Sequence, residues 1–192
     1  MFVPLKTLIS KFKEDDTSLN RILSSFSCDK DKDIEFFLRN KAVDFEKVSK
    51  SRTYLFCDYQ EFSENPIVVL GYFTLSLKVL ILPDELSVHA RKELDGFRGK
   101  IHGIPIKEIP CFLIGQLAKN SNIANNPISG KKLLTYANSI IKSVISSLGG
   151  RIILIECQEN EKLLKFYSDN GFYEFVRDSY NDKTMVQLLK KI

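Results

Sequence analysis

The feature that most constrains the fold is a long amphipathic helix set between two apolar strands. Apolar residues recur at helical spacing over residues 130–148 and form one broad face. Gly149 and Gly150 follow, at the position where glycine commonly ends a helix. The apolar runs 111–118 and 152–157 are typical of buried strands. This order predicts an α/β fold in which a right-handed crossover joins two parallel strands.

The N-terminal half carries weaker signals. Segments 5–12 and 18–26 fit either amphipathic helices or strands, and the role of the first 25 residues stays open between an edge strand and a cover for the acceptor cleft. Apolar spacing predicts one helix over about 34–47. Aromatic and β-branched residues predict strands over 52–59 and 67–82, joined by a hairpin loop at 61–66. A short helix is expected over 86–94 and a loop over 95–110.

The C-terminal part is expected to add a helix and a closing hairpin. The helix runs from about residue 159 to 169, and Gly171 lies just past its end, the usual place for a left-handed cap. Two strands over 172–176 and 185–189 then pair around Asn181 and Asp182.

Composition limits the class of protein. A chain of 192 residues, 44% hydrophobic and 27% charged, fits one globular domain over residues 1–192 that needs no disulfide or metal to fold. A net charge of +4 is mild for a dedicated nucleic-acid binder, yet compatible with an anionic ligand. No apolar run approaches the ~20 residues of a membrane span, and no signal peptide is visible. We therefore predict a soluble cytoplasmic protein without membrane contact.

The four cysteines point to a packing role. Cys28, Cys57, Cys111 and Cys157 form no Cys-x-x-Cys pair, and neither histidine lies near them in the sequence. This spacing argues against a zinc site. Cysteine in apolar runs behaves as a small buried hydrophobe, so we expect reduced core thiols and no metal.

A first candidate site lies where the strand over 111–118 leads into the long helix. Ligands of α/β units gather at strand carboxyl ends and helix N-termini, which places a ligand around residues 117–131. Unpaired N–H groups at a helix start favour phosphates, Gly130 allows close approach, and Lys131 and Lys132 add positive charge. A structural glycine beside two solvated lysines explains the same residues, so this signal alone decides nothing.

The second candidate is the helix over 159–169. Phe166 and Tyr167 stand near one another on it, and Asn170, Gly171 and Phe172 follow. From spacing alone, simple packing of these aromatic residues is the favoured interpretation. The segment nevertheless resembles the C-terminal motif of the GNAT acetyltransferases, in which an asparagine, here Asn160, opens a helix and a Phe-Tyr pair precedes Asn-Gly-Phe.

The resemblance extends over about residues 26–175. Residues 113–118 resemble the family's acetyl-CoA strand. The segments 26–28, 37–42, 51–54 and 71–75 resemble the N-terminal half of one GNAT branch, which includes bacterial toxins that acetylate aminoacyl-tRNA. One departure is clear. The family loop reads Gln/Arg-x-x-Gly-x-Gly/Ala, but residues 125–130 read Asn-Asn-Pro-Ile-Ser-Gly and keep only the last glycine. Pyrophosphate binding would then rely more on Ser129 and the two lysines.

What the resemblance implies is a GNAT-like, mostly antiparallel mixed sheet with helices on both faces and a splayed central pair of parallel strands. Acetyl-CoA would serve as co-substrate, without a metal. The implied cofactor-binding residues are Leu117, Ala118, Lys119, Asn125, Ser129, Gly130, Lys131, Asn160 and Phe166. Tyr167 would protonate the departing CoA thiolate, and Glu156 is a candidate general base acting through water, or else a solvent-facing carboxylate.

Three functions remain open at this point. The first is an N-acetyltransferase in which a primary amine of a small molecule or protein attacks acetyl-CoA directly. The second is a toxin-type enzyme that acetylates the amino group of aminoacyl-tRNA and has a small antitoxin partner. The third is a degenerate, non-catalytic CoA-binding module, suggested by the altered loop. A homodimer is left open for each.

Overall fold

The computed structural model describes residues 1–59, 67–180 and 183–192. Their contacts divide them into two compact units, each described here by itself. Unit 1 comprises residues 1–76 and 115–139, and unit 2 comprises residues 77–114 and 140–192. The expected hairpin turns at 61–66 and at Asn181 and Asp182 lie outside the described residues. A single domain over residues 1–192 stays a prediction.

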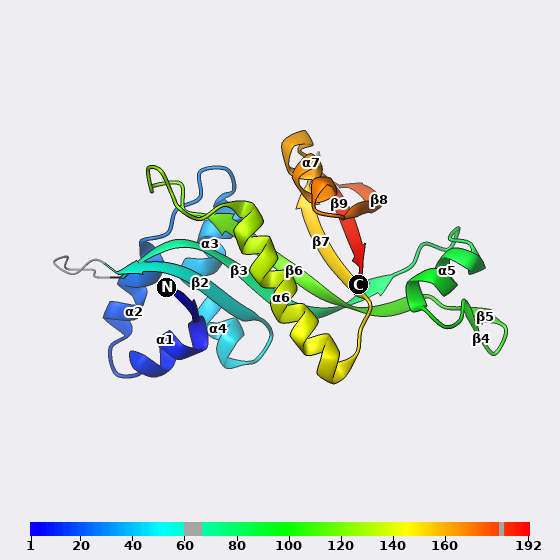
Figure 1. The fold of residues 1–192 in the computed structure, drawn as a ribbon, viewed down its shortest axis with the longest axis horizontal. Helices are drawn as coiled ribbons and strands as arrows, with labels where there is room; N and C mark the ends of the chain where they lie inside the picture. The colour runs from blue at the N-terminus through cyan, green and yellow to red at the C-terminus, as the bar shows by residue number, and fades with distance from the viewer. Residues whose placement is uncertain (60–66, 181–182) are drawn as a thin grey trace. The chain divides into compact units, whose positions relative to one another are not determined.

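The chain forms one mostly antiparallel sheet with strand order β1-β2-β3-β6-β7-β9-β8, and a separate β4-β5 ribbon (Figure 1). The strands are β1 (Phe2–Pro4), β2 (Arg52–Tyr59), β3 (Ile67–Ile81), β4 (Lys100–Ile101), β5 (Ile104–Pro105), β6 (Glu108–Lys119), β7 (Ile152–Gln158), β8 (Tyr173–Tyr180) and β9 (Lys183–Lys191). The helices are α1 (Leu5–Lys11), α2 (Asp16–Ser24), α3 (Lys32–Asn40), α4 (Ala42–Lys47), α5 (Val88–Asp95), α6 (Gly130–Leu148) and α7 (Glu161–Asp169). The parallel pair is confirmed between β6 and β7, where Phe112 pairs with Ile153 and Leu113 with Leu154.

The structure settles one open choice and corrects two expectations. The segments 5–12 and 18–26, left open between helix and strand, correspond to the helices α1 and α2, and residues 2–4 add an edge strand. The single helix expected over 34–47 is two helices, because Lys41 leaves helical geometry with φ −122° and ψ −30°. The expected loop over 95–110 contains the β4-β5 ribbon, and β6 begins at Glu108 and runs through Pro110.

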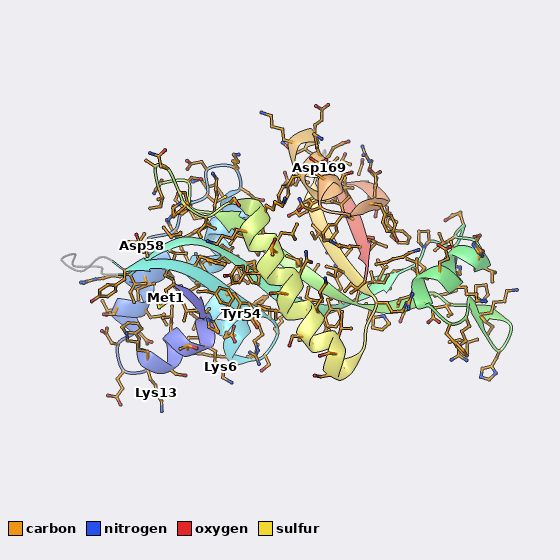
Figure 2. All side chains as sticks on the ribbon, viewed as in Figure 1. Met1, Lys6, Lys13, Tyr54, Asp58 and Asp169 are labelled. Atoms are coloured by element: carbon orange, nitrogen blue, oxygen red, sulfur yellow. The ribbon has the colours of Figure 1, made fainter. Side chains whose placement is uncertain are left out.

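In unit 1, helices cover both faces of the sheet. Leu55 of β2 points to one face and is buried among residues of α1, α2 and α3. Its neighbours Tyr54 (labelled in Figure 2) and Phe56 point to the other face, because side chains alternate along a strand. There Tyr136 of α6 packs edge-on against Phe56, with 4.9 Å between the ring centroids. The sheet and the start of α6 therefore form one packed body within this unit.

Glu35 of α3 fastens this helix to the turn that follows α2. Its carboxylate accepts hydrogen bonds from the Cys28 N–H at 2.9 Å and the Ser27 hydroxyl at 3.0 Å. It also pairs with Lys32 at 3.1 Å and Arg39 at 2.8 Å. The bond from the Cys28 N–H, with the Lys32 contact next in size, lowers the pKa of Glu35 from 4.5 to about 2. These groups stabilise the ionised form, which links folding to pH.

We expect the free energy of unfolding to fall less steeply at acidic pH in Glu35→Gln than in the wild type. Because the pKa is lower in the folded protein, ionised Glu35 stabilises the fold above the unfolded-state value of 4.5. That contribution is lost as the pH falls toward about 2. Urea unfolding at a series of pH values would measure it, with Asp33→Asn on the same helix as control. Parallel curves for wild type and Glu35→Gln would contradict this linkage.

In unit 2, the sheet packs one apolar face around Leu80, Cys111 and Leu154. The segment between β3 and β6 is held by Arg91 of α5, which is only 2% exposed. Its guanidinium donates to the carbonyl oxygens of Leu86 and Asp84, at 2.9 and 3.1 Å, and to those of Pro83 and Ile106. One buried side chain therefore ties both ends of this segment together.

All four cysteines are free, and three of them are buried, as the sequence predicted. Burial raises the pKa of Cys57 to about 12 and those of Cys111 and Cys157 to about 11. Among the described residues, no group of three or more His, Cys, Asp or Glu side chains could hold a metal ion. No described helix is both long and apolar enough to cross a membrane.

Candidate active site

The start of α6 in unit 1 has two unpaired N–H groups. Ser129 precedes the helix, and its hydroxyl accepts the Lys132 N–H at 3.1 Å while its carbonyl accepts the Leu133 N–H. Within the described residues, the N–H groups of Gly130 and Lys131 donate to no protein atom. The helix start therefore offers two donors and the positive end of the helix dipole to an anion. Because its hydroxyl already caps the helix, Ser129 is less free for a phosphate than the sequence suggested.

The end of β6 lies against a bulge in β3. Phe56 pairs with Gly71 but Cys57 pairs with Val69, which leaves Leu70 as an extra residue on β3. The Asn120 N–H donates to the Leu70 carbonyl at 2.8 Å. A Cβ added at Gly71 would lie 3.0 Å from the Ala118 carbonyl oxygen, so a larger residue would require the end of β6 to move by a few tenths of an ångström.

Near its end, β6 carries the backbone groups of Leu117 and Lys119, two of the residues that the family resemblance assigns to cofactor binding. The N–H groups of Gln116 and Asn120 both point toward β3, where they donate to the Thr74 hydroxyl and the Leu70 carbonyl. Because backbone groups alternate along a strand, those of Leu117 and Lys119 point to the opposite edge. This orientation suits hydrogen bonds from a bound ligand.

In unit 2, α7 begins as predicted with Asn160 as its N-cap (orange in Figure 1). The Asn160 side-chain oxygen accepts the Leu163 N–H at 3.1 Å, while its amide N–H₂ makes no bond among the described residues. The helix ends at Asp169 (labelled in Figure 2), and Gly171 follows with the predicted positive φ of 84°. The cap fixes the Asn160 backbone and leaves its amide donors free.

Tyr167 is the buried aromatic residue of α7, at 5% exposure. Phe166 and Phe172 pack against its ring edge-on, with ring centroids 5.0 and 5.7 Å away. Burial raises the pKa of Tyr167 well above its ordinary value, with a smaller contribution from nearby Cys157. Its hydroxyl stays protonated at neutral pH and has no hydrogen-bond partner in the part of the chain that the structure describes. The packing interpretation is confirmed for the ring, and the functional role of the hydroxyl stays a prediction.

Glu156 lies on β7, paired across the sheet with Gln187. One carboxylate oxygen accepts from the Gln187 side-chain amide at 3.0 Å, and the other pairs with Lys78 at 2.5 Å. Lys78 and Gln187 therefore hold the two carboxylate oxygens of Glu156 in place. Its role as base stays a prediction.

The predicted site residues therefore form two groups. Unit 1 holds the strand end and helix start, namely Leu117, Ala118, Lys119, Asn125, Ser129, Gly130 and Lys131. Unit 2 holds Glu156, Asn160, Phe166 and Tyr167. Asn125 is exposed and adopts a left-handed φ of 52°, and no described hydrogen bond involves its side chain. Sequence reasoning missed Lys78 and Asn126, because their partners lie 78 and 56 positions away along the chain.

A separate polar pocket of about 400 Å³ lies in unit 2, lined by His89, Lys92, Glu93, Gly96, Arg151 and Lys191. None of the predicted site residues lines it. Glu93 pairs there with Lys191 at 2.9 Å, so part of the positive charge is neutralised. The candidate groups that remain are the start of α6 in unit 1 and, in unit 2, the protonated hydroxyl of Tyr167 on α7.

Comparison with known proteins gives a likeness of fold. No protein-family model matches the chain, and no curated protein matches it. Among solved structures, AtaT complexed with acetyl-methionyl-tRNAfMet is 23% identical, with a TM-score of 0.60, over 85% of each chain. AtaTR bound with acetyl-CoA is 24% identical, with a TM-score of 0.61, over 86% of this chain and 84% of that one.

A tyrosine-to-phenylalanine mutant of KacT is 19% identical, with a TM-score of 0.61, over 86% of this chain and 85% of that one. This chain shares the fold of AtaT and KacT. The mixed, mostly antiparallel GNAT-like sheet predicted from the sequence is thereby confirmed.

Proposed function

We propose that the protein is an acetyl-CoA-dependent N-acetyltransferase that acetylates the amino group of an aminoacyl-tRNA. The observation that carries this proposal is the fold shared with AtaT, a protein seen with acetyl-methionyl-tRNA, over 85% of both chains. The proposal thus prefers the toxin-type alternative to an enzyme for small or protein amines. By the same reasoning we propose a small antitoxin as partner, since AtaT is also seen bound to the antitoxin AtaR.

The residues of unit 1 fit the phosphate end of acetyl-CoA. Two free N–H groups at Gly130 and Lys131 suit a pyrophosphate, and the side chains of Lys131 and Lys132 add charge. The outward backbone groups of Leu117 and Lys119 suit the amides of the pantetheine arm. A non-catalytic CoA-binding module would use the same donors, and the presence of Tyr167 at the position of the family's general acid argues against it.

The residues of unit 2 fit the thioester chemistry. The amine attacks the thioester carbon, the C–S bond breaks, and the products are an amide and free CoA thiol. Tyr167 provides a protonated hydroxyl to the departing sulfur, and Glu156 takes the amine proton through water. The Asn160 amide is a donor for the acetyl-pantetheine end. Positioning of the two substrates supplies a large share of the acceleration.

Transfer of radiolabelled acetyl from acetyl-CoA to purified aminoacyl-tRNA tests the proposal. We expect label on aminoacyl-tRNA and none on the same tRNA after deacylation, because deacylation removes the amine. Expression of the wild-type chain should arrest bacterial growth. Label on polyamines or proteins alone would support the small-amine or protein-amine enzyme instead. Acetyl-CoA binding in calorimetry without transfer to any amine would support the non-catalytic CoA-binding module, and no binding at millimolar concentration would exclude all three functions.

A further inference from the structure

The loop that replaces the family's glycine-rich segment is fastened by asparagine side chains. Asn120, at its start, is 1% exposed. Its side-chain nitrogen donates to the carbonyls of Ser25 and Val69, both at 2.7 Å. Its side-chain oxygen accepts the N–H groups of Ser27 at 3.2 Å and Asn122 at 3.0 Å. The first residue after β6 is therefore fixed to the body of unit 1.

Asn126 makes the second attachment, at the centre of the loop. Its side-chain nitrogen donates to the Leu70 carbonyl at 2.8 Å and to the Asn120 carbonyl at 3.1 Å. Its side-chain oxygen accepts the Ile128 N–H at 2.9 Å. One amide thus connects the β3 bulge, the end of β6 and the residue that leads into α6. All of its hydrogen-bonding capacity except one oxygen lone pair is used.

The hydrogen bond from Ile128 to Asn126 lies close to the start of α6 in the chain, and the residues between them have little conformational freedom. Ile128 is 5% exposed, so its side chain is anchored in the core of unit 1. Pro127 before it has a fixed φ and no N–H, which leaves that stretch few alternative conformations. Ser129 and Gly130 follow directly. Asn126 is therefore linked to the start of α6 by a short segment that contains a proline and a buried isoleucine.

We propose that Asn126 is the positioning residue of the pyrophosphate site, which it holds in the binding geometry before the ligand arrives. This inference rests on the proposed use of acetyl-CoA. A loop that is already ordered loses less conformational freedom on binding, so affinity is kept although the glycines of the family loop are absent. Asn126 itself does not contact the ligand in this role; it acts through Ile128 and the start of α6.

The test compares acetyl-CoA with acetyl-pantetheine, which lacks the pyrophosphate. Calorimetric affinities for both ligands are measured in wild type, Asn126→Ala and the control Asn122→Ala, whose exposed side chain lies on the same loop. We expect Asn126→Ala to weaken acetyl-CoA binding about tenfold while acetyl-pantetheine binding stays within about twofold. Asn122→Ala should match wild type for both ligands. Asn126→Ser keeps an acceptor for the Ile128 N–H and should fall between, which provides a second variant if alanine prevents folding.

The outcomes separate the two proposals. Equal weakening for both ligands would mean that Asn126 only maintains the fold, and unchanged acetyl-CoA affinity would mean that the loop is ordered without it. Either result overturns the positioning role while the acetyl-CoA function stands. Absence of acetyl-CoA binding in the wild type would instead overturn the proposed function, and the positioning role with it.

Discussion

Replacing Tyr167 with phenylalanine is expected to lower the rate of acetyl transfer at least about tenfold, with little change in acetyl-CoA affinity. The change removes only the hydroxyl, so the ring keeps its packing against Phe166 and Phe172. The lost group is a donor that has no protein partner among the described residues. Its absence should therefore be felt when negative charge develops on the departing sulfur, not when the cofactor binds.

The raised pKa of Tyr167 sharpens this expectation. Because the pKa of Tyr167 lies well above 10, its hydroxyl stays protonated near neutral pH. Its ionisation should therefore cause no change in the acetyl-transfer rate with pH in that range. In the proposed mechanism, the hydroxyl shares its proton with the sulfur as the C–S bond breaks. Initial rates and calorimetry on Tyr167→Phe would be compared with Tyr173→Phe, the same change on β8. Unchanged turnover would end the general-acid role, and a parallel loss of affinity would assign Tyr167 to binding.

The second large effect is expected at Arg91. Arg91→Ala should lower the free energy of unfolding by about 3 kcal/mol, because it leaves four carbonyl oxygens without their donor and opens a cavity. Arg91→Lys should recover only part of the loss, since an ammonium group lacks the planar fork that spans carbonyls on both sides. The partners are all backbone oxygens, so only another hydrogen-bond donor could replace the guanidinium.

Urea unfolding measures this loss, with Lys92→Ala as the control on the exposed face of the same helix. The control should stay within about 0.5 kcal/mol of wild type. Hydrogen exchange should show the fastest opening in residues 83–107 of the Arg91→Ala variant. A variant as stable as wild type would mean that water replaces the guanidinium at no net cost, contrary to its burial.

Local sequence signals predicted the elements near the candidate site well. The helix over 130–148 is confirmed at both ends, because its periodicity ends at a Gly-Gly pair. Asn160 is confirmed as a helix cap, since a side-chain cap is a matter of neighbouring residues. The break between α3 and α4 at Lys41 had no such local signal, because apolar positions continue at helical spacing across it. Glu35 and Arg39 fix α3 to residues 24–28 through tertiary contacts, which the local sequence does not show.

The sequence could not predict the long-range contacts that hold the candidate site residues in place. In the sequence, Asn126 is an ordinary loop residue. In the structure, its side-chain amide donates to the carbonyl of Leu70, the extra residue in the β3 bulge. The bulge itself depends on the pairing of β2 with β3, which local preference does not set. Lys78 likewise was one exposed lysine on a strand until β7 brought Glu156 beside it.

The chemistry of the four cysteines makes this chain a good starting point for site-specific labelling. A thiol with a pKa of about 11 is ionised in only about one molecule in 10⁴ at pH 7, and maleimides react with the thiolate. The native thiols should therefore give little background during a brief reaction. A cysteine introduced at the exposed Asp169 would carry a fluorophore at the end of α7, next to the aromatic cluster around Tyr167. Binding of acetyl-CoA to the proposed site could then be followed by fluorescence, without a known acceptor.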